Sequence, residues 1–331
     1  MTTASLQSSH PNTVHTLWVI ARKEIHQAFR NRLFVTALVM LLALSLVAIS
    51  LGAATVHTRI ADYEQAAQVL RDLGRTNIPP MAALNPIAVS KNFVNYLAMV
   101  GALLAMILGF TSIDRERKAG TLRLILSRPV YRDQLLTGKV LGNALLLAVL
   151  MVAVGLVTVL ALRFIGSLSL TADQMIKLML TMGMSWLYTL IFFLLAMFLA
   201  LRVPNGNQAL LLTVIVWLVF AFIFPQIGDT MDLDNQLPGG FFASIGVSPD
   251  QEHKALERFR WYESVRDGVE ELSPTKHYER ISFALLGVKT EFANTPWNEV
   301  IQLKMIDLVG LIVPIIVLLG ASYVVFLRQE Q

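Results

Sequence analysis

The side chains that could do chemistry in this chain are few and widely spaced. The 331 residues include six histidines and no cysteine, which excludes a thiolate metal site, a cysteine nucleophile and a disulfide. The one Gly-Lys pair, Gly138-Lys139, is followed by Val140 and lacks the upstream glycine of a phosphate-binding loop. The sequence also contains no His-Glu-x-x-His or Gly-x-Ser-x-Gly motif. We therefore predict no catalytic residue, no metal site and no nucleotide cradle in this chain, and we expect that it is not an enzyme.

Two groups of side chains deserve comparison with metal sites. Four methionines crowd the start of one hydrophobic run: Met175, Met179, Met182 and Met184. They could form a thioether path for copper, but soft packing against lipid and neighbouring helices is the commoner use of methionine. His253 and His277 lack the ligand spacing of a metal site, so we expect them to be ordinary polar surface.

The most informative feature is a basic segment, residues 114–139, with the sequence DRERKAGTLRLILSRPVYRDQLLTGK. It holds seven Lys and Arg residues against three acids. The pattern predicts a short helix, a break marked by Pro129 and the start of a second helix. Because the segment lies between two long hydrophobic runs, it could act as a lever beside the membrane. A soluble protein that pushes on this segment would then move the two hydrophobic runs attached to it.

The elements that must position this segment are membrane helices. The chain is 55% hydrophobic and only 15% charged, whereas soluble domains carry about 25% charged residues. Six uncharged runs each approach the ~20 residues that a helix needs to cross the hydrocarbon core. They cover residues 33–56, 93–113, 140–162, 178–201, 209–227 and 308–327. We therefore predict an all-α, polytopic membrane protein with six transmembrane helices.

The distribution of Lys and Arg predicts the orientation of these spans. Basic residues precede the first span, fill residues 114–139 and flank the fourth and sixth spans at Arg202 and Arg328. All of these positions fall on one side of a six-span layout. The positive-inside rule then places both termini and segment 114–139 in the cytoplasm. We expect a multi-pass protein of the bacterial cytoplasmic (inner) membrane.

Further helices are predicted beside the spans. Residues 14–32 carry apolar side chains, Trp18 among them, on one face and basic side chains on the other, which is typical of a helix lying in the membrane interface. After the first span, a short separate helix is predicted near residues 62–73. The chain then divides into a cytoplasmic N-terminus, spans one to five, an extracytoplasmic helical cap, and the sixth span with its cytoplasmic tail: 1–32, 33–227, 228–304 and 305–331.

The extracytoplasmic cap has the pattern of two amphipathic helices. The first begins at residues 248–251, where a capping serine precedes a proline, and the second follows Ser273-Pro274. Aromatic side chains of the kind favoured as interface anchors sit together on the first helix: Phe259, Trp261 and Tyr262. We expect the cap to gate the outer exit of a path or to dock an extracytoplasmic protein, against the plainer role of a structural lid.

Charged side chains are nearly absent from the interior of the spans. Arg163, Lys177 and Asp307 lie at span ends, where a long side chain can snorkel to the interface. An ion or proton carrier usually needs an ionisable residue within the membrane. The pattern therefore disfavours a self-contained secondary transporter and a pump that supplies its own energy.

Two spans carry patterned side chains. Small residues recur every four positions in the second span: Gly101, Ala105 and Gly109. Such a ladder lets helix backbones approach closely, and it could serve packing within the bundle, a dimer seam or the wall of a path. The fifth span is rich in aromatic residues towards its outer end: Trp217, Phe220 and Phe224. They could form an interfacial belt or an apolar gate for a hydrophobic substrate.

Segment 114–139 resembles the cytoplasmic signature of permeases of the type-2 ABC transporter family. That signature joins an acidic and basic stretch, Gly-Thr-Leu, a leucine-rich turn, Ser-x-Pro-Val, an arginine and Gly-Lys at the next span. Here these are Asp114–Lys118, Gly120-Thr121-Leu122, Leu124–Leu126, Ser127-Arg128-Pro129-Val130, Arg132 and Gly138-Lys139. Where the family often has an acid after Gly-Thr-Leu, this chain has Arg123. The chain is most similar to the subgroup named for multi-copper-enzyme maturation, which includes the membrane subunit of the nitrous-oxide-reductase maturation transporter.

The resemblance implies a non-catalytic permease that works with separate ABC ATPase subunits. ATP and Mg would bind the partner ATPase, this chain would hold no cofactor, and a second permease copy would complete a homodimer or a related pair. Segment 114–128 would be the coupling helix, seated in a cleft of the ATPase. The second and fifth spans would line the central path. The residues assigned to coupling are Asp114, Glu116, Arg117, Gly120, Thr121, Leu122 and Arg123.

Three functions fit these observations. The first is an exporter of an amphiphilic or hydrophobic substrate. The second is a mechanical transducer that uses ATP to act on an extracytoplasmic partner protein docked on the cap, as in metalloenzyme maturation, without bulk transport. The third is a non-transporting membrane anchor for a complex. The uncharged interior of the spans suits a path for a hydrophobic substrate and a bundle that transmits movement to a partner protein equally well.

Overall fold

The computed structural model describes residues 13–75, 85–120, 132–166, 170–231, 245–246 and 260–328. Within these residues the chain is helical and contains no strand. Six of the described helices are long and apolar enough to cross a membrane. They are Arg32–Gly52, Lys91–Lys118, Asp133–Phe164, Ala172–Arg202, Gly206–Gly228 and Met305–Arg328. The prediction of an all-α protein with six spans is therefore confirmed.

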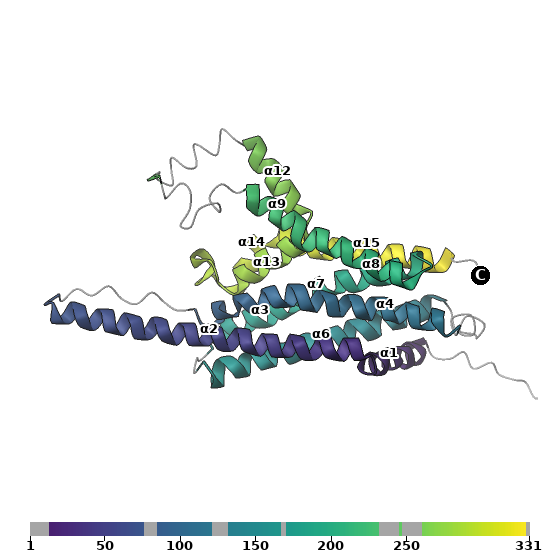
Figure 1. Ribbon diagram of the computed structural model, residues 1–331, viewed down its shortest axis with the longest axis horizontal. Coiled ribbons are helices and arrows are strands. Elements are labelled where there is room, and N and C mark those ends of the chain that lie inside the picture. The colour runs from purple at the N-terminus through teal and green to yellow at the C-terminus, as the bar shows by residue number, and fades with distance from the viewer. Residues whose placement is uncertain are drawn as a thin grey trace, which may run out of the picture.

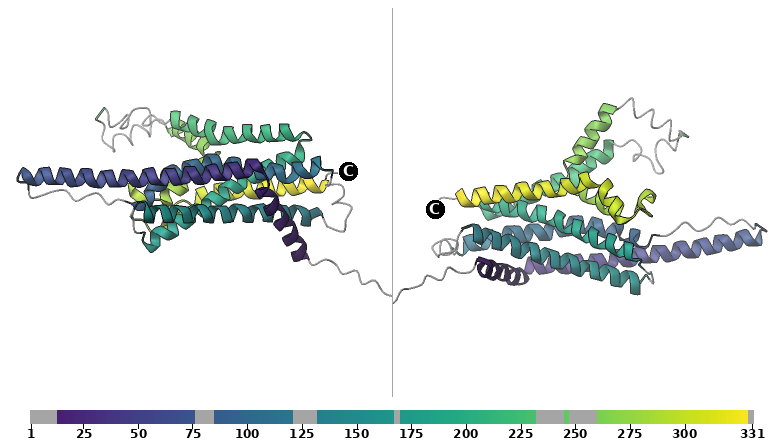
Figure 2. Two further views of the ribbon diagram at one scale, coloured as in Figure 1. Left: turned by 60° about the horizontal axis from the view of Figure 1, so that its bottom comes forward. Right: turned by 180° about the vertical axis from the view of Figure 1, so that it is seen from behind.

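The spans form an elongated bundle in which successive helices alternate in direction. Helix α1 (Thr13–Phe29) and the C-terminal end of α15 (Met305–Arg328) lie at the same end of the bundle (Figure 1). We call this end the terminal end, and the opposite one the far end. α1 runs at a steep angle to the spans beside it (Figure 2).

Helix α2 (Arg32–Asp72) is one unbroken helix of 41 residues. At 1.5 Å per residue it is about 60 Å long, roughly twice the ~30 Å hydrocarbon core of a bilayer. It therefore extends past the rest of the bundle at the far end (Figure 1). The prediction of a separate helix near residues 62–73 is wrong, because no Gly or Pro stands between 57 and 72 and the good helix formers there continue the span.

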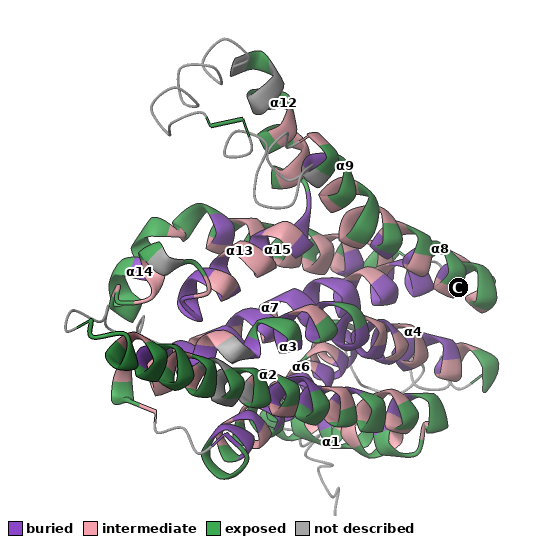
Figure 3. Ribbon diagram, turned by 60° about the vertical axis from the view of Figure 1, so that its left-hand side comes forward, coloured by how far each residue is buried: buried purple, intermediate pink, exposed green. Residues whose placement is uncertain are grey.

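Helices α4 (Ala102–Lys118) and α7 (Ala172–Arg202) form the centre of the bundle. In the most apolar stretch of the second and fourth spans 72% of the residues are buried, against 11% in the fifth and sixth spans. Buried residues accordingly gather on α4 and α7 in Figure 3. Around α7 pack α6 (Arg132–Phe164), α8 (Gly206–Leu218) and α15.

A π-helical turn interrupts two of the spans. In the second span, η2 (Leu97–Gly101) lies between α3 (Lys91–Tyr96) and α4. In the fifth span, η3 (Val219–Ile223) lies between α8 and α9 (Phe224–Met231). Such turns shift the pattern of backbone hydrogen bonds and are frequent at functional sites.

Beyond η3 the fifth span leaves the bundle. Helix α9 turns away from the other spans, and α12 (Arg260–Glu271) packs beside it (Figure 1). We call this pair the α9–α12 arm. Shorter elements complete the described chain: η1 (Pro86–Ser90) before α3, and η5 (Thr290–Phe292) and α14 (Trp297–Leu303) before α15.

Helix α13 (Pro274–Leu285) is packed inside the bundle. It contacts α7, α15 and η3. Tyr278 is 0% exposed and stacks on Tyr188 with 4.6 Å between ring centroids. Tyr188 lies near the middle of α7, so α13 reaches far into the span region. Residues 274–285 were expected in an extracytoplasmic cap, and their buried stripe instead belongs to the core of the bundle.

Hydroxyl groups tie α13 to both π-helical turns. Ser273, at the start of α13, donates to the carbonyl of Phe220 in η3 at 2.6 Å. Tyr188 donates to the carbonyl of Ala98 in η2 at 3.0 Å and lies 3.2 Å from the hydroxyl of Thr275. The inserted helix thus connects the second, fourth and fifth spans.

Candidate functional site

A buried cluster of ion pairs joins α1, α4 and α6 at the terminal end. Lys139 of α6 places its Nζ 2.8 Å from Glu24 Oε1 and 2.9 Å from Glu116 Oε1. The same ammonium donates to the carbonyl of Ser112 at 2.7 Å. Lys139 and Glu24 are each 1% exposed. The ammonium group of Lys139 therefore links α6 to α1 and α4, three helices that are distant from one another in the chain.

Further donors surround the two carboxylates of this terminal cluster. Lys23 donates to Glu116 Oε1 at 2.7 Å. Glu24 Oε2 lies 3.8 Å from Arg115 Nη2 and accepts a hydrogen bond from Asn143 at 3.4 Å. Together with the lysine of α6, three cations face two carboxylates. A buried charge is tolerated only with such compensation.

Glycines allow α1 to lie directly on α6. A Cβ atom at Gly142 would stand 2.7 Å from Ala21 Cα and 2.8 Å from its carbonyl oxygen. A Cβ atom at Gly138 would stand 2.8 Å from Ile20 Cβ. These distances leave no room for a side chain, so α1 and α6 are held in one register and we expect them to move together.

The last turn of α4 also contacts the connection between α7 and α8. Arg117 donates to four backbone carbonyls there: Ala200 at 2.7 Å, Val203 at 2.8 Å, Pro204 at 3.2 Å and Leu201 at 3.5 Å. These bonds satisfy carbonyls that the end of a helix leaves free. Asp114 lies against Gly206 at the start of α8, where the helix dipole favours a carboxylate, and it pairs with Lys118 at 2.8 Å.

The structure describes four of the seven predicted coupling residues. Contacts within the chain engage three of them: Asp114, Glu116 and Arg117. Gly120, with φ 64°, ends this described stretch, and the remaining three lie outside the described residues: Thr121, Leu122 and Arg123. Residues 114–118 continue α4, so they form no separate coupling helix. Contact of an ATPase with these side chains stays a prediction, and their internal contacts are a role that the sequence pattern did not indicate.

Sequence reasoning missed the terminal cluster, although a signal for it exists. The buried face of α1 consists of Ala21, Glu24 and Ala28, which recur at helical spacing. A single acid between two small residues on one helix face indicates a close neighbour with a counter-charge. The larger apolar side chains of the face predicted to lie in the membrane interface, Trp18 and Phe29, are exposed, as side chains that face the membrane would be.

The small-residue ladder of the second span lies against α7. Ala105 is buried. A Cβ atom at Gly109 would collide with the carbonyl oxygen of Phe193 and stand 2.9 Å from Ala196 Cβ, and one at Gly101 would stand 3.4 Å from Thr189 Cγ2. The ladder thus lets α4 and α7 touch within one chain.

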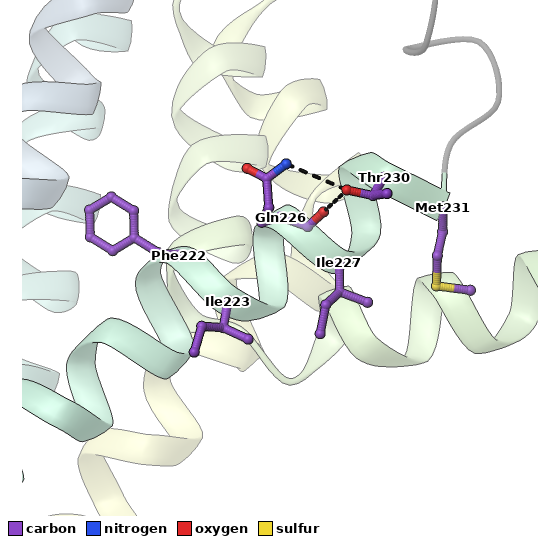
Figure 4. Close-up of a pocket in the computed structure, with 6 residues that line it drawn as sticks. All are labelled: Phe222, Ile223, Gln226, Ile227, Thr230 and Met231. Carbon is purple, nitrogen blue, oxygen red and sulfur yellow. Dashed lines mark hydrogen bonds between the residues drawn. The ribbon is translucent and has the colours of Figure 1, made fainter.

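The aromatic residues of the fifth span pair along its own axis. Trp217 is buried and meets Phe222 edge to face at 5.5 Å between ring centroids. Phe220 meets Phe224 in the same way at 5.3 Å. These pairs bridge the π-helical turn η3. One face of η3 and α9 lines an open depression of ≈ 470 Å³, with Phe222 at one end and Met231 at the other (Figure 4).

The α9–α12 arm presents apolar side chains at the far end. Trp261 is 69% exposed, and Val265, one turn along α12, is exposed as well. Two more aromatic residues were predicted to anchor a partner. Phe259 lies outside the described residues, as does the side chain of Tyr262.

A second buried cluster joins α13 to α15 towards the far end. His277 Nδ1 lies 2.9 Å from Asp307 Oδ1, and His277 Nε2 lies 2.9 Å from the carbonyl oxygen of Glu271. Arg280 bridges the acids, with Nε 2.9 Å from Asp307 Oδ1 and Nη2 2.7 Å from Glu271 Oε1. The ring of His277 also rests on Gly310.

Three expectations for polar residues near the span ends are wrong. His277 was expected on the surface and is buried. Lys177 and Asp307 were expected to snorkel, and both are buried. Counter-charges explain the burial, because Lys177 pairs with Asp173 at 2.9 Å and Asp307 with Arg280. His253 lies outside the described residues.

Comparison with known proteins is consistent with this architecture. Residues 18–331 match a family described as ABC-2 family transporter protein. A stretch of 132 residues is 34% identical to the probable ABC transporter permease protein NosY of Pseudomonas aeruginosa, which is 40% of each chain. A stretch of 135 residues is 33% identical to the protein of the same name from Stutzerimonas stutzeri, 41% of each chain. The chain thus spans about two fifths of the length of these curated relatives.

Proposed function

Because the chain belongs to the ABC-2 family of transporter proteins and is a membrane subunit of an ABC transporter, we propose that it couples ATP hydrolysis by separate ATPase subunits to export of an amphiphilic or hydrophobic substrate. ATP and Mg would bind the partner ATPase. This chain would supply the spans and the surface on which the ATPase acts. Closure of the ATPase pair would favour one arrangement of the spans over another.

The contacts of the last turn of α4 carry the coupling proposal. Glu116 connects this turn to α1 and α6, whereas Asp114 and Arg117 connect it to the turn between α7 and α8. A displacement applied just beyond Lys118 would therefore reach four other helices through buried ion pairs and hydrogen bonds. We propose that the ATPase contacts residues 119–131 and that the terminal cluster transmits the motion.

The substrate class is proposed from the character of the bundle. The two charged clusters lie towards its ends, and the contacts between α4 and α7 are made largely by apolar and small side chains. A charged solute crossing such a bundle would need ionisable partners inside the membrane. A hydrophobic or amphiphilic molecule would not.

A second copy of the chain is proposed as the permease partner, with both termini in the cytoplasm and the assembly in the bacterial inner membrane. The fifth and sixth spans are the least buried. They expose large apolar side chains along α8 and α15, including Leu211, Ile215, Ile316 and Val317. Lipid and a second copy are both suitable neighbours for such faces.

A mechanical transducer is the second candidate function. It is favoured by two features of the far end, namely the overhang of α2 and the exposed Trp261 on the α9–α12 arm. Both offer surface beyond the bundle on which an extracytoplasmic protein could dock. Stimulation of ATP hydrolysis by such a protein, without stimulation by any amphiphile of a substrate panel, would favour this function over export.

A matched pair of bulky substitutions tests the coupling end. Ala119 and Ala66 are both exposed, the first just past α4 and the second on the overhang of α2. We expect Ala119→Trp to abolish co-purification with the cognate ATPase and to remove its stimulation in nanodiscs. Ala66→Trp should leave both unchanged. Equal ATPase binding by the two variants would remove the coupling role from this end.

A further inference from the structure

An apolar groove runs between α6 and α7. Its volume is ≈ 400 Å³. Its lining consists of apolar side chains and glycines, with three methionines from the start of α7 at one wall: Met175, Met179 and Met182. The one polar atom of a lining side chain, the indole N–H of Trp186, donates to the carbonyl of Ala144 at 2.9 Å. The groove therefore offers no hydrogen bond from its side chains to a polar ligand.

The groove lies in the far half of the spans, and part of its rim is exposed. α6 ends at Phe164 and α7 begins at Ala172, both at the far end, and the groove residues fall in the adjoining halves of these helices. Met179, on its rim, is 68% exposed. An apolar groove at this depth faces hydrocarbon, so a lipid acyl chain is its natural occupant. Flexible thioether side chains adapt well to such a chain.

A cation stands in line with the groove. Gly155 and Val159 line the groove, and Arg163 follows at the next four-residue step, so all three share one face of α6. Arg163 is exposed, and among the described residues no acidic side chain pairs with it. It lies one turn beyond the groove, at the end of the candidate span Asp133–Phe164, where a headgroup phosphate would stand.

From this alignment we propose that the groove between α6 and α7 is a binding site for one membrane phospholipid, with an acyl chain in the groove and the phosphate on Arg163. The apolar lining selects the chain, and the guanidinium provides the paired hydrogen-bond donors that suit a phosphate. The site is separate from the terminal cluster, so it does not depend on the coupling proposal.

Two glycines provide a matched test of the groove. A Cβ atom at Gly183, which lines the groove, or at Gly320 of α15 would have no other atom within 4 Å. Gly183→Leu would therefore fill the groove without displacing the backbone, whereas Gly320→Leu adds the same bulk elsewhere. The probe is phosphatidylglycerol with brominated acyl chains in nanodiscs, because bromine quenches indole fluorescence on contact. Trp186→Phe identifies the signal of Trp186.

We expect bromine to quench Trp186 strongly in the native chain and in Gly320→Leu, and at least threefold less in Gly183→Leu. Native mass spectrometry should find one phospholipid retained per chain in the first two proteins only. Equal quenching and equal retention in Gly183→Leu would overturn the site. Cross-linking between copies through Met179→Cys would also overturn it, since the groove would then be covered by a second chain.

A second variant tests the headgroup contact without filling the groove. Arg163→Gln alters an exposed side chain and should leave the fold intact. We expect it to weaken retention of phosphatidylglycerol about fivefold, the effect of one basic residue at a membrane surface. Unchanged retention would overturn the assignment of the phosphate to Arg163.

Discussion

Lys139 of α6 and Glu24 of α1 form an ion pair 2.8 Å long in which each side chain is only 1% exposed. A buried pair of this kind adds little net stability, because desolvation of the charges offsets their attraction. Removal of one partner is nevertheless costly, since the other is left buried without compensation. The pair therefore specifies how α1 sits on the bundle.

The first prediction concerns this pair. Lys139→Met should lower the free energy of unfolding by about 3–5 kcal/mol, since two buried carboxylates lose their shared counter-charge. Lys118→Met is the comparison, because Lys118 is 67% exposed and its buried partner Asp114 keeps the start of α8 beside it. The loss should therefore be smaller than in Lys139→Met. The double change Glu24→Gln with Lys139→Met should recover part of the loss. Thermal unfolding in nanodiscs measures all three, and equal losses in the two lysine variants would contradict the prediction.

The second prediction concerns Arg117. Arg117→Lys should lose most of the hydrogen bonds to the turn between α7 and α8, because an ammonium lacks the planar fork that reaches several carbonyls at once. Hydrogen exchange of the amides near Val203 should accelerate, with a loss of about 1.5–3 kcal/mol typical of hydrogen bonds to a charged group. Arg202→Lys, at an exposed side chain, should leave the exchange rates unchanged. Reversal of Glu116 and Arg117 together should therefore disturb the spans as well as ATPase binding.

The third prediction ranks three glycines. Gly109→Ala should destabilise the bundle by about 1–3 kcal/mol, the usual cost of overpacking, because its new Cβ meets the backbone of Phe193. Gly101→Ala should cost less, because its closest neighbour is the flexible side chain of Leu97. Gly183→Ala meets open space and should be nearly neutral. Thermal unfolding tests the order, and a larger loss at Gly101 than at Gly109 would reverse the ranking.

The fourth prediction concerns topology. The chain has no cysteine, so single cysteines can be placed without background. We expect Ala119→Cys to react with an impermeant thiol reagent only from the cytoplasmic side, and Asp72→Cys and Asp267→Cys only from the other side. Membrane vesicles of known sidedness provide the measurement. Labelling of positions 72 and 119 from the same side would contradict the six-span layout.

The fifth prediction separates α12 from α13. Tyr278→Ala should destabilise the bundle by about 3–5 kcal/mol, as expected for removal of a large buried aromatic ring. Trp261→Ala should leave the unfolding temperature unchanged, because the side chain is largely exposed. Loss of cellular function in Trp261→Ala with intact folding would indicate a docking role for the α9–α12 arm. Similar unfolding temperatures for the two variants would contradict the insertion of α13 into the bundle.

Local pattern was sufficient for the main elements of the fold. Six apolar runs predicted six spans, because inside a bilayer each backbone polar group must be satisfied within its own helix, so the length of the run decides. The family signature at Gly120-Thr121-Leu122 and Gly138-Lys139 is also local. It predicted membership of the permease family, which the match over residues 18–331 confirms.

The depth of α13 and the terminal cluster could only be decided by the tertiary structure. The sequence predicts an amphipathic helix at residues 274–285, but its neighbours are set by contacts with Tyr188 and Phe220, far away in the chain. Likewise, Glu24 and Lys139 are unremarkable charges until α1 lies on α6. The physical reason is that helix formation depends on neighbouring residues, whereas burial of a charge or a tyrosine depends on which helix face meets which.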